Sequence, residues 1–347
     1  MSSKLTELWP EVYDKTSIGS DRFLTPGPSF LKLENAVKTR DYYFVLLPKM
    51  TMLAFSSAVE PLRVANQLTG QCLYRWYVIS EDGKSVVCSN GISIAVDFAL
   101  HPVERQDTII VCSGHDGYSA AGSKTLGMLR LHHRRGGQVG GICTGAYTLA
   151  RAGLLEDKKF TLHWGNQPAF EERFSRLEVS AQIYEKDAGI ITCGGGTAVT
   201  DMMLAIIEED YGRKLTHLVM DMCVHGKKRN ADTRQKASIA TTINSRNGRL
   251  IRIVHRMQEN IAEPLSFDEL TCLEGISKRQ MERLFKRYLG VGPSQHYISI
   301  RLDYGRSLVF ETDMSVMEIS VACGFSSSSH FSKSYKKRFG VCPSANM

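Results

Sequence analysis

One cysteine flanked by glycines is the residue of this 347-residue chain that is best placed to do chemistry. Cys143 stands in the segment Gly140-Gly-Ile-Cys-Thr-Gly145, between an apolar stretch and a helical pattern. This arrangement is that of a nucleophile elbow, where a tight turn exposes one side chain at the carboxyl edge of a parallel sheet. A helix that begins directly after such a thiol would lower its pKa. The alternative is a small buried residue that fits a tight turn.

The C-terminal segment contains two copies of one sequence motif. Ser266 and Ser315 are each followed three residues later by glutamate, which forms the capping box that starts a helix. Gly275 and Gly324 then stand at the same distance from these serines, where a helix-turn-helix needs a residue tolerant of positive φ. A basic helix follows each glycine and ends at Gly-Val-x-Pro-Ser. The pattern predicts two helix-turn-helix units, and the alternative is a small helical bundle with solvated basic faces.

Exposed positions near the start of each second helix are candidates for base contacts, because that end of a recognition helix enters the major groove. Two such helices on one domain can reach successive grooves about 34 Å apart. Arg283 is expected to bind guanine, since a guanidinium can bond O6 and N7 together. Any one of these side chains can instead be a solvated polar residue. The expected base contacts are Arg279, Glu282, Arg283, Ser328, Ser329, His330 and Lys333, the expected phosphate contacts are Lys286, Arg287, Lys336, Lys337 and Arg338, and the expected buried faces are Met281, Leu284, Phe285, Phe331 and Tyr335.

Residues 250 to 347 resemble the DNA-binding domain of AraC-type transcriptional regulators, in which a long helix joins two helix-turn-helix units. The duplicated cap, turn and exit carry this resemblance. It implies that the joining helix runs from about Ser294 to Phe310. It also implies double-stranded promoter DNA as a partner, and RNA polymerase as a further one.

The segment from 41 to 225 alternates strand and helix patterns, beginning with Asp41-Tyr-Tyr-Phe-Val-Leu-Leu-Pro48. Such alternation predicts an α/β domain with a mostly parallel sheet covered on both faces. Together with Thr161-Leu-His-Trp164, the cysteine segment resembles the DJ-1/PfpI-like domain that is fused to AraC-type regulators. The expected organisation is a loosely ordered tail (1–40), a flavodoxin-like DJ-1/PfpI sandwich (41–225), a basic linker and hinge (226–248) and an all-α DNA-binding domain (249–347).

The same resemblance shows where this chain departs from the catalytic members. DJ-1/PfpI-like enzymes carry an acidic residue beside the cysteine, and Ala54 aligns with it here. Hydrolase-like members place histidine after the cysteine, where this chain has Thr144. Without an activating partner, Cys143 lacks the usual arrangement of nucleophile and base. We therefore expect a sensor domain without a catalytic residue. The alternatives are a DJ-1/PfpI-like hydrolase or hydratase that uses Cys143, and an architectural DNA-binding protein that responds to no effector.

Open α/β sheets bind ligands at the carboxyl edge of their strands. Regulators similar to this chain respond to nitrogenous metabolites such as glycine betaine, carnitine or arginine, and activate the operons that degrade them. An indole and a carboxylate attract a quaternary ammonium or guanidinium, and Trp164 and Glu60 can supply them. The alternatives are a tryptophan in the core and, for His163, a satisfied buried histidine. The expected effector contacts are Glu60, Gly114, His115, Cys143, Thr144, His163 and Trp164.

The composition of the chain bears on disulfides, metal sites, membrane spans and location in the cell. The nine cysteines include no Cys-x-x-Cys pair, so we expect no disulfide framework, no metal site and no cofactor. No apolar run approaches the roughly 20 residues of a membrane span, and the N-terminus lacks a secretory pattern, so we expect a cytoplasmic protein without a membrane partner. From resemblance alone we expect a homodimer.

Charge is distributed unevenly along the chain. Residues 1–211 carry 21 Lys and Arg against 24 Asp and Glu, residues 212–248 carry 8 against 2, and residues 249–347 carry 14 against 10. A basic run is often only a solvated face. Next to a double helix-turn-helix, however, this asymmetry indicates that the C-terminal part meets nucleic acid.

Overall fold

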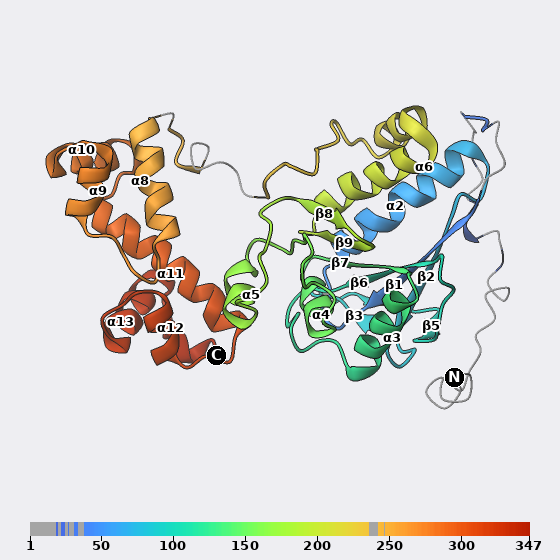
Figure 1. Ribbon diagram of the computed structural model, residues 1–347, viewed down its shortest axis with the longest axis horizontal. Coiled ribbons are helices and arrows are strands. Elements are labelled where there is room, and N and C mark those ends of the chain that lie inside the picture. Colours follow the sequence, from blue (N-terminus) through green and yellow to red (C-terminus); the bar gives the residue numbers. More distant parts are fainter. Residues whose placement is uncertain are drawn as a thin grey trace. The chain divides into compact units, whose positions relative to one another are not determined.

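The computed structural model describes residues 19, 22–24, 27, 31–33, 38–235, 242–245 and 247–347 (Figure 1). The chain folds into two compact units. Unit 1 contains the residues up to Gln167 and Phe174–Gln235, and unit 2 contains Pro168–Arg173 and Lys236–Met347. The chain therefore passes from unit 1 into unit 2 first after Gln167 and finally after Gln235.

Unit 1 is built on a sheet whose central strands are near-continuous apolar runs, as is typical of strands covered on both faces. In its described residues, seven strands lie in the order β5-β2-β1-β6-β7-β9-β8. Neighbouring strands are parallel except for β8 and β9, which are antiparallel. The predicted α/β flavodoxin-like fold is confirmed. The strands are β1 (Arg40–Leu46), β2 (Tyr74–Ser80), β5 (Phe98–Ala99), β6 (Thr108–Cys112), β7 (Gln138–Ile142), β8 (Tyr184–Asp187) and β9 (Ile190–Cys193), and β3 (Val86–Val87) pairs separately with β4 (Ser93–Ile94).

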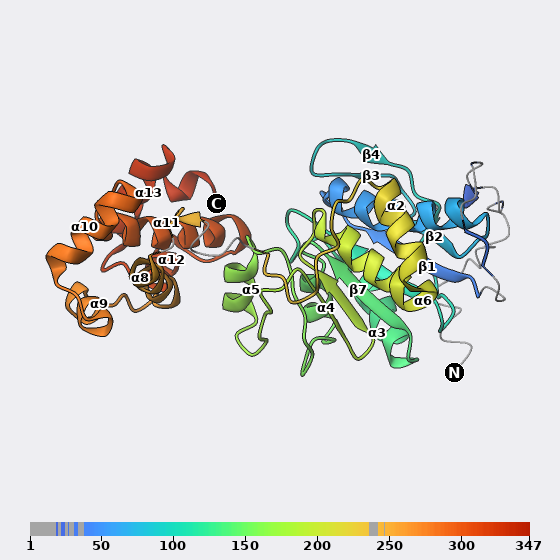
Figure 2. The ribbon, with the colours of Figure 1, turned by 90° about the horizontal axis from the view of Figure 1, so that it is seen from above.

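Helices cover both faces of this sheet. Helices α2 and α6 lie side by side on one face, and α3 and α4 lie on the other (Figures 1 and 2). Helix α6 kinks at Gly212, whose φ of 81° and ψ of 174° suit glycine almost alone. Its apolar residues Met202, Met203, Ile206 and Ile207 are buried. The helices are α2 (Met52–Thr69), α3 (Ser123–Arg134), α4 (Ala146–Arg151) and α6 (Ala198–Met222).

The segment before β1 contributes to the core of unit 1. Phe23 is buried with its ring edge-on to Trp76 and Tyr77. Its backbone O accepts a hydrogen bond from Asn66 Nδ2 at 3.0 Å. The expectation of a loosely ordered tail is therefore wrong at Phe23, because its ring completes an aromatic cluster that no local sequence pattern reveals. Most of the remaining tail lies outside the described residues.

Residues 225–235, called the strap below, also pack on unit 1. The carboxylate of Asp201 is fully buried in α6 and accepts hydrogen bonds from the backbone N and the Nε of Arg229, at 2.7 and 2.8 Å. Further along, Ile183 N donates to Thr233 O at 2.8 Å. The first part of the expected linker (226–248) is therefore not a hinge, because a buried carboxylate and strand-like bonds hold it. Residues 236–241 and 246 lie outside the described residues.

Unit 2 contains the two predicted helix-turn-helix units. Ser266 and Ser315 each form the predicted capping box, with Glu269 and Glu318. The predicted joining helix is α11, within one residue at each end. Its helices are α8 (Gly248–Glu259), α9 (Phe267–Glu274), α10 (Lys278–Leu289), α11 (Pro293–Glu311), α12 (Val316–Ala322), α13 (Ser328–Phe339) and the short η3 (Pro343–Ala345). Unit 2 also includes residues 168–173 of α5 (Gln167–Arg173).

Each helix-turn-helix of unit 2 is tied to the helix before it by an arginine. Arg252 of α8 donates to the buried carboxylate of Glu274 at 2.7 Å. Arg301 of α11 stands at the equivalent position, 49 residues later, and donates to Cys323 O at 2.7 Å. Cys323 is in turn the equivalent of Glu274 at the same offset. The structural repeat therefore includes the preceding helix as well as the helix-turn-helix.

Candidate functional site

The elbow expected from the sequence lies at the carboxyl end of β7. Cys143 has a φ of 59°, in the left-handed region that residues other than glycine rarely occupy. Its backbone N donates to Cys193 O at 2.9 Å, which continues the pairing of β7 with β9. A Cβ at Gly145 would lie 2.7 Å from Val111 O, so only glycine lets the turn pack this closely on β6. Backbone strain of this kind is concentrated at functional sites.

Loops from neighbouring strands surround the side chain of Cys143, which is 8% exposed. Thr51 follows β1, and its Oγ1 lies 3.4 Å from the Cys143 Sγ. Gly195 follows β9, and a Cβ there would come within 3.0 Å of the Cys143 Cβ. Behind the elbow, burial raises the pKa of the Cys193 thiol to about 12. The hydroxyl beside the Cys143 thiol is a hydrogen-bonding group and not a base at neutral pH.

Trp164 and His163 lie beside the elbow. The backbone N of His163 donates to Cys143 O at 3.0 Å, which anchors this loop to the strained turn. The Trp164 side chain is 45% exposed, and its ring centroid lies 5.4 Å from that of His163. Trp164 is therefore not a core residue, and part of its indole is accessible to a ligand at the sheet edge.

Three further predicted residues lie at the same edge but differ in role. Thr144 is buried, and its hydroxyl donates to Gly114 O at 2.6 Å. This bond ties the loop after β6 to the elbow, so the Thr144 hydroxyl is engaged within the fold. His115 is exposed in that loop, and its backbone N donates to Lys49 O at 3.2 Å. The structure thus brings together Gly114, His115, Cys143, Thr144, His163 and Trp164.

Glu60 is not brought to the elbow. It lies in α2 nine residues after Thr51, which is about 13 Å along the helix at 1.5 Å per residue. Its carboxylate pairs with Arg63 Nε at 2.8 Å. It also lies close enough to Cys223, at the C-terminal end of α6, to raise the pKa of that thiol, although burial is the larger cause. The expected carboxylate of the effector site therefore faces another part of unit 1.

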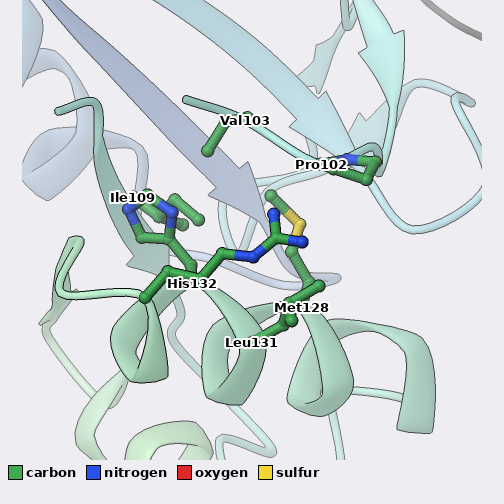
Figure 3. Close-up of a pocket in the computed structure, with 7 residues that line it drawn as sticks. Pro102, Val103, Ile109, Met128, Leu131 and His132 are labelled. Atoms are coloured by element: carbon green, nitrogen blue, oxygen red, sulfur yellow. The ribbon is translucent and has the colours of Figure 1, made fainter. Parts of the chain in front are cut away.

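A cavity in unit 1 lies near the amino end of β6, away from this edge. Figure 3 shows its lining side chains from α3 and from the loop before β6. Its volume of about 10 Å³ is room for about one water molecule. Burial lowers the pKa of His132 in its wall. The cavity is too small for a metabolite. Its lining residues are Pro102, Val103, Ile109, Met128, Leu131, His132 and Arg135.

Within the described ranges, no group of three or more His, Cys, Asp or Glu side chains is arranged to hold a metal ion. The cysteines of the chain are free. Among the helices that the structure describes, none is both long and apolar enough to span a membrane.

The first recognition helix, α10, has one buried and one exposed face. Met281 and Phe285 are buried in the core of the first repeat, and Leu284 is only half-buried. Ser277 accepts a hydrogen bond from Gln280 N at 3.2 Å and fixes the start of the helix. The predicted DNA contacts Arg279, Glu282, Arg283, Lys286 and Arg287 are exposed.

The second recognition helix, α13, follows the same plan with one exception. Phe331 and Tyr335 are buried, while Ser329, His330, Lys333, Lys336 and Lys337 are exposed and Ser328 is half-buried. Arg338, however, makes hydrogen bonds of 2.8 and 2.7 Å to the two carboxylate oxygens of Asp303 in α11. This expected phosphate contact is therefore engaged within unit 2, and the sequence could not show it because the partner lies 35 positions earlier.

Gln235 at the end of the strap is a site residue that the sequence did not indicate. Its Oε1 accepts a hydrogen bond from Trp164 N at 2.9 Å. Its Nε2 lies 2.8 Å from Thr161 Oγ1 and 2.9 Å from Leu162 O. A glutamine within a polar, basic run has the composition of a linker, and only the fold brings it to the sheet edge.

Comparison with known proteins agrees with both parts of this architecture. The helix-turn-helix domain model matches residues 273–346, and the DJ-1/PfpI family model matches residues 45–209. The chain is 40% identical over 306 residues to the HTH-type transcriptional regulator CdhR of Pseudomonas aeruginosa, covering 88% of this chain and 91% of that one. It is 38% identical over 300 residues to GbdR of the same species, covering 86% and 82%. It is 35% identical over 303 residues to GlxA of Rhizobium meliloti, covering 86% and 93%. The chain therefore belongs to the AraC-type transcriptional regulators that carry a DJ-1/PfpI domain together with a helix-turn-helix domain.

Proposed function

We propose that this transcriptional regulator reads its operator through α10 and α13 and activates a catabolic operon when a small nitrogenous metabolite binds at the elbow of unit 1. The effector belongs to the class of glycine betaine, carnitine or arginine, to which the resemblance with regulators of their catabolism points. The protein acts in the cytoplasm as a homodimer, with RNA polymerase as its partner at the promoter.

The exposed faces of the two recognition helices support the DNA part of this proposal. Each helix is held by buried aromatic or apolar residues and presents basic and polar side chains outward. Arg283 reads guanine, while Lys286, Arg287, Lys336 and Lys337 bind phosphates. Sequence preference therefore resides in a few side chains, and most of the affinity is electrostatic.

The observation that carries the effector part is an exposed tryptophan beside a strained elbow. The partly accessible indole of Trp164 offers a face to a quaternary ammonium or guanidinium. Helix α6 begins at Ala198, three residues after Gly195, where a Cβ would come to 3.0 Å from the Cys143 Cβ, and the partial positive charge of its N-terminus suits a carboxylate. Glycine betaine and its relatives carry both groups. Because Glu60 does not lie at the elbow, the indole of Trp164 is the group that binds the cation.

Unit 1 acts as a sensor and not as an enzyme. Ala54, at the position of the acid in catalytic relatives, is 1% exposed and has no titratable group. The Cys143 thiol lies beside the Thr51 hydroxyl, which does not activate a nucleophile as a base would. A hydrolase or hydratase that uses Cys143 is the second candidate, because the strained elbow is present. Turnover of an isocyanide or an aldehyde that is abolished by Cys143→Ala would establish it.

A thermal-shift panel on the full-length protein tests the effector class. Glycine betaine, dimethylglycine, carnitine, choline and arginine are each added in excess. A ligand at a hundred times its Kd stabilises the protein by about 2.7 kcal/mol, which raises Tm by several degrees. One clear responder identifies the effector, and silence across the panel refutes the proposed class.

Selection of bound sequences from a pool of random DNA duplexes tests the DNA part of the proposal and provides the operator. A failure to enrich any sequence would refute sequence-specific reading.

A further inference from the structure

The two places where the chain leaves unit 1 for unit 2 meet at the effector edge. Gln167 and Gln235 are the last residues of unit 1 before these passages. Gln167 Nε2 donates to Leu162 O at 3.2 Å, and Gln235 Nε2 donates to the same oxygen at 2.9 Å. Leu162 lies two residues before Trp164. Both exits are therefore bonded to the backbone of the loop that carries the indole.

The side chain of Gln235 fits a specific slot in this loop. Its Oε1 accepts from Trp164 N, and its Nε2 also donates to Gln182 O at 2.9 Å. On the other side, a Cβ at Gly194 would lie 2.3 Å from the Gln235 Oε1. Gly194 is followed by Gly195, where a Cβ would come to 3.0 Å from the Cys143 Cβ. The carboxamide thus lies between the two segments that border the elbow.

The rest of the strap is bonded to other parts of unit 1. Its start is fixed by Asp201, which accepts from His225 and Arg229. Its middle is bonded to Ile183. A displacement of the Trp164 loop therefore acts on the end of the strap, at Gln235, directly before the chain enters unit 2.

We propose that Gln235 is the positioning residue that couples the Trp164 loop of the sensor to the DNA-binding unit. Its backbone N donates to Ala181 O at 3.0 Å, and its side-chain amide links the same residue to the Trp164 loop, directly before the chain enters unit 2. The inference rests on the proposed effector site, since a ligand that contacts Trp164 is what uses the coupling. Coupling between two sites is reciprocal in binding free energy, so operator DNA is expected to change effector affinity by the same factor and, through Gln235, to shift the equilibrium of the Trp164 loop.

This reciprocity gives a test that needs DNA only. Acrylamide quenching of tryptophan fluorescence is measured in a Trp9→Phe variant of the full-length protein, with and without the selected operator duplex. Trp76 is 7% exposed and is poorly quenched, so the accessible signal comes from Trp164. The operator is expected to change the quenching constant. Gln235→Ala is expected to abolish this change while the protein still binds the operator.

Two further variants make the test specific. Gly194→Ala retains Gln235 but displaces its Oε1, and it is expected to abolish the change as well. Arg234→Ala alters the exposed neighbouring strap residue and is expected to keep it. Circular dichroism and Tm identify any variant that fails to fold, and Gly194→Ala then replaces Gln235→Ala. A response that survives in Gln235→Ala, or none in the parent protein, overturns the proposal. Because no metabolite is used, this outcome is separate from a silent thermal-shift panel.

Discussion

The left-handed backbone of Cys143 costs about 1–3 kcal/mol at a residue other than glycine. Nearby glycines let the surrounding loops approach closely enough to hold this conformation, as at Gly145 and Gly195. The strained turn places the Cys143 thiol beside the Thr51 hydroxyl. The neighbouring loop carries the partly exposed indole of Trp164. At the scale of single residues, the elbow is thus a strained turn held in place by the loops packed around it.

Trp164→Ala is expected to remove effector binding with little loss of stability. The side chain is 45% exposed, so its removal leaves no core cavity. The measurement is the thermal shift caused by the responding metabolite, compared between the parent and the variant. Trp164→Phe is the matched control, since a smaller aromatic face should retain part of the shift. An unchanged shift in Trp164→Ala would place the effector elsewhere.

Arg283→Ala is expected to weaken operator binding by about 1–3 kcal/mol and to relax preference at one base pair, while binding to random duplexes changes little. Titrations against the operator and a scrambled duplex measure this. Lys286→Ala, one helical turn later on the same exposed face, should weaken both duplexes alike and reduce the salt slope by about one. Equal weakening of both duplexes by Arg283→Ala would reassign Arg283 to phosphate.

At the scale of elements, Glu274 makes the first helix-turn-helix sensitive to acid. Burial would raise the pKa of this carboxyl, but hydrogen bonds from Arg252 and Arg256 outweigh it and hold the pKa below its ordinary value of 4.5. A group with a lowered folded-state pKa stabilises the fold above its unfolded pKa, and this contribution is lost as the pH falls through the folded-state value.

Unfolding by urea is therefore expected to become easier below about pH 4.5, partly through Glu274. Glu274→Gln should lower stability at neutral pH and reduce its dependence on pH in the acid range. Glu263→Gln, at an exposed position of the same unit, is the control and should behave as the parent. If both variants retained the parental acid dependence, another carboxylate would be responsible.

The sequence predicts elements better than it predicts the contacts between them. Capping boxes and apolar periodicity are local, so the recognition helices and the joining helix are found within a few residues. The tight glycine spacing likewise marks the elbow. Contacts between distant segments have no local signal, which is why the sequence shows neither the bond of Arg338 to Asp303 nor that of Trp164 to Gln235. The sequence also could not show that Glu60 lies away from the elbow, because its position along the chain does not tell which way its side chain points from α2.

At the scale of the whole molecule, the basic side chains of unit 2 determine how strongly operator affinity depends on salt concentration. Four proposed phosphate contacts give a slope of log K against log salt of about −4, or a loss of roughly two orders of magnitude between 50 and 200 mM salt. Titrations of the operator at several salt concentrations measure it. A slope near −7 would mean that both protomers of a dimer engage the duplex, and a slope near zero would contradict the assigned contacts.

The equivalence of Arg252 and Arg301 defines what can be exchanged between regulators of this architecture. Each arginine joins a helix-turn-helix to the helix before it, at equivalent positions 49 residues apart. A chimera that transplants only the helix-turn-helix would separate Glu274 from its arginines and leave a buried carboxylate unpaired. The transferable module is therefore the three-helix block, and half-sites of an operator should be recombined by joining such blocks within α11.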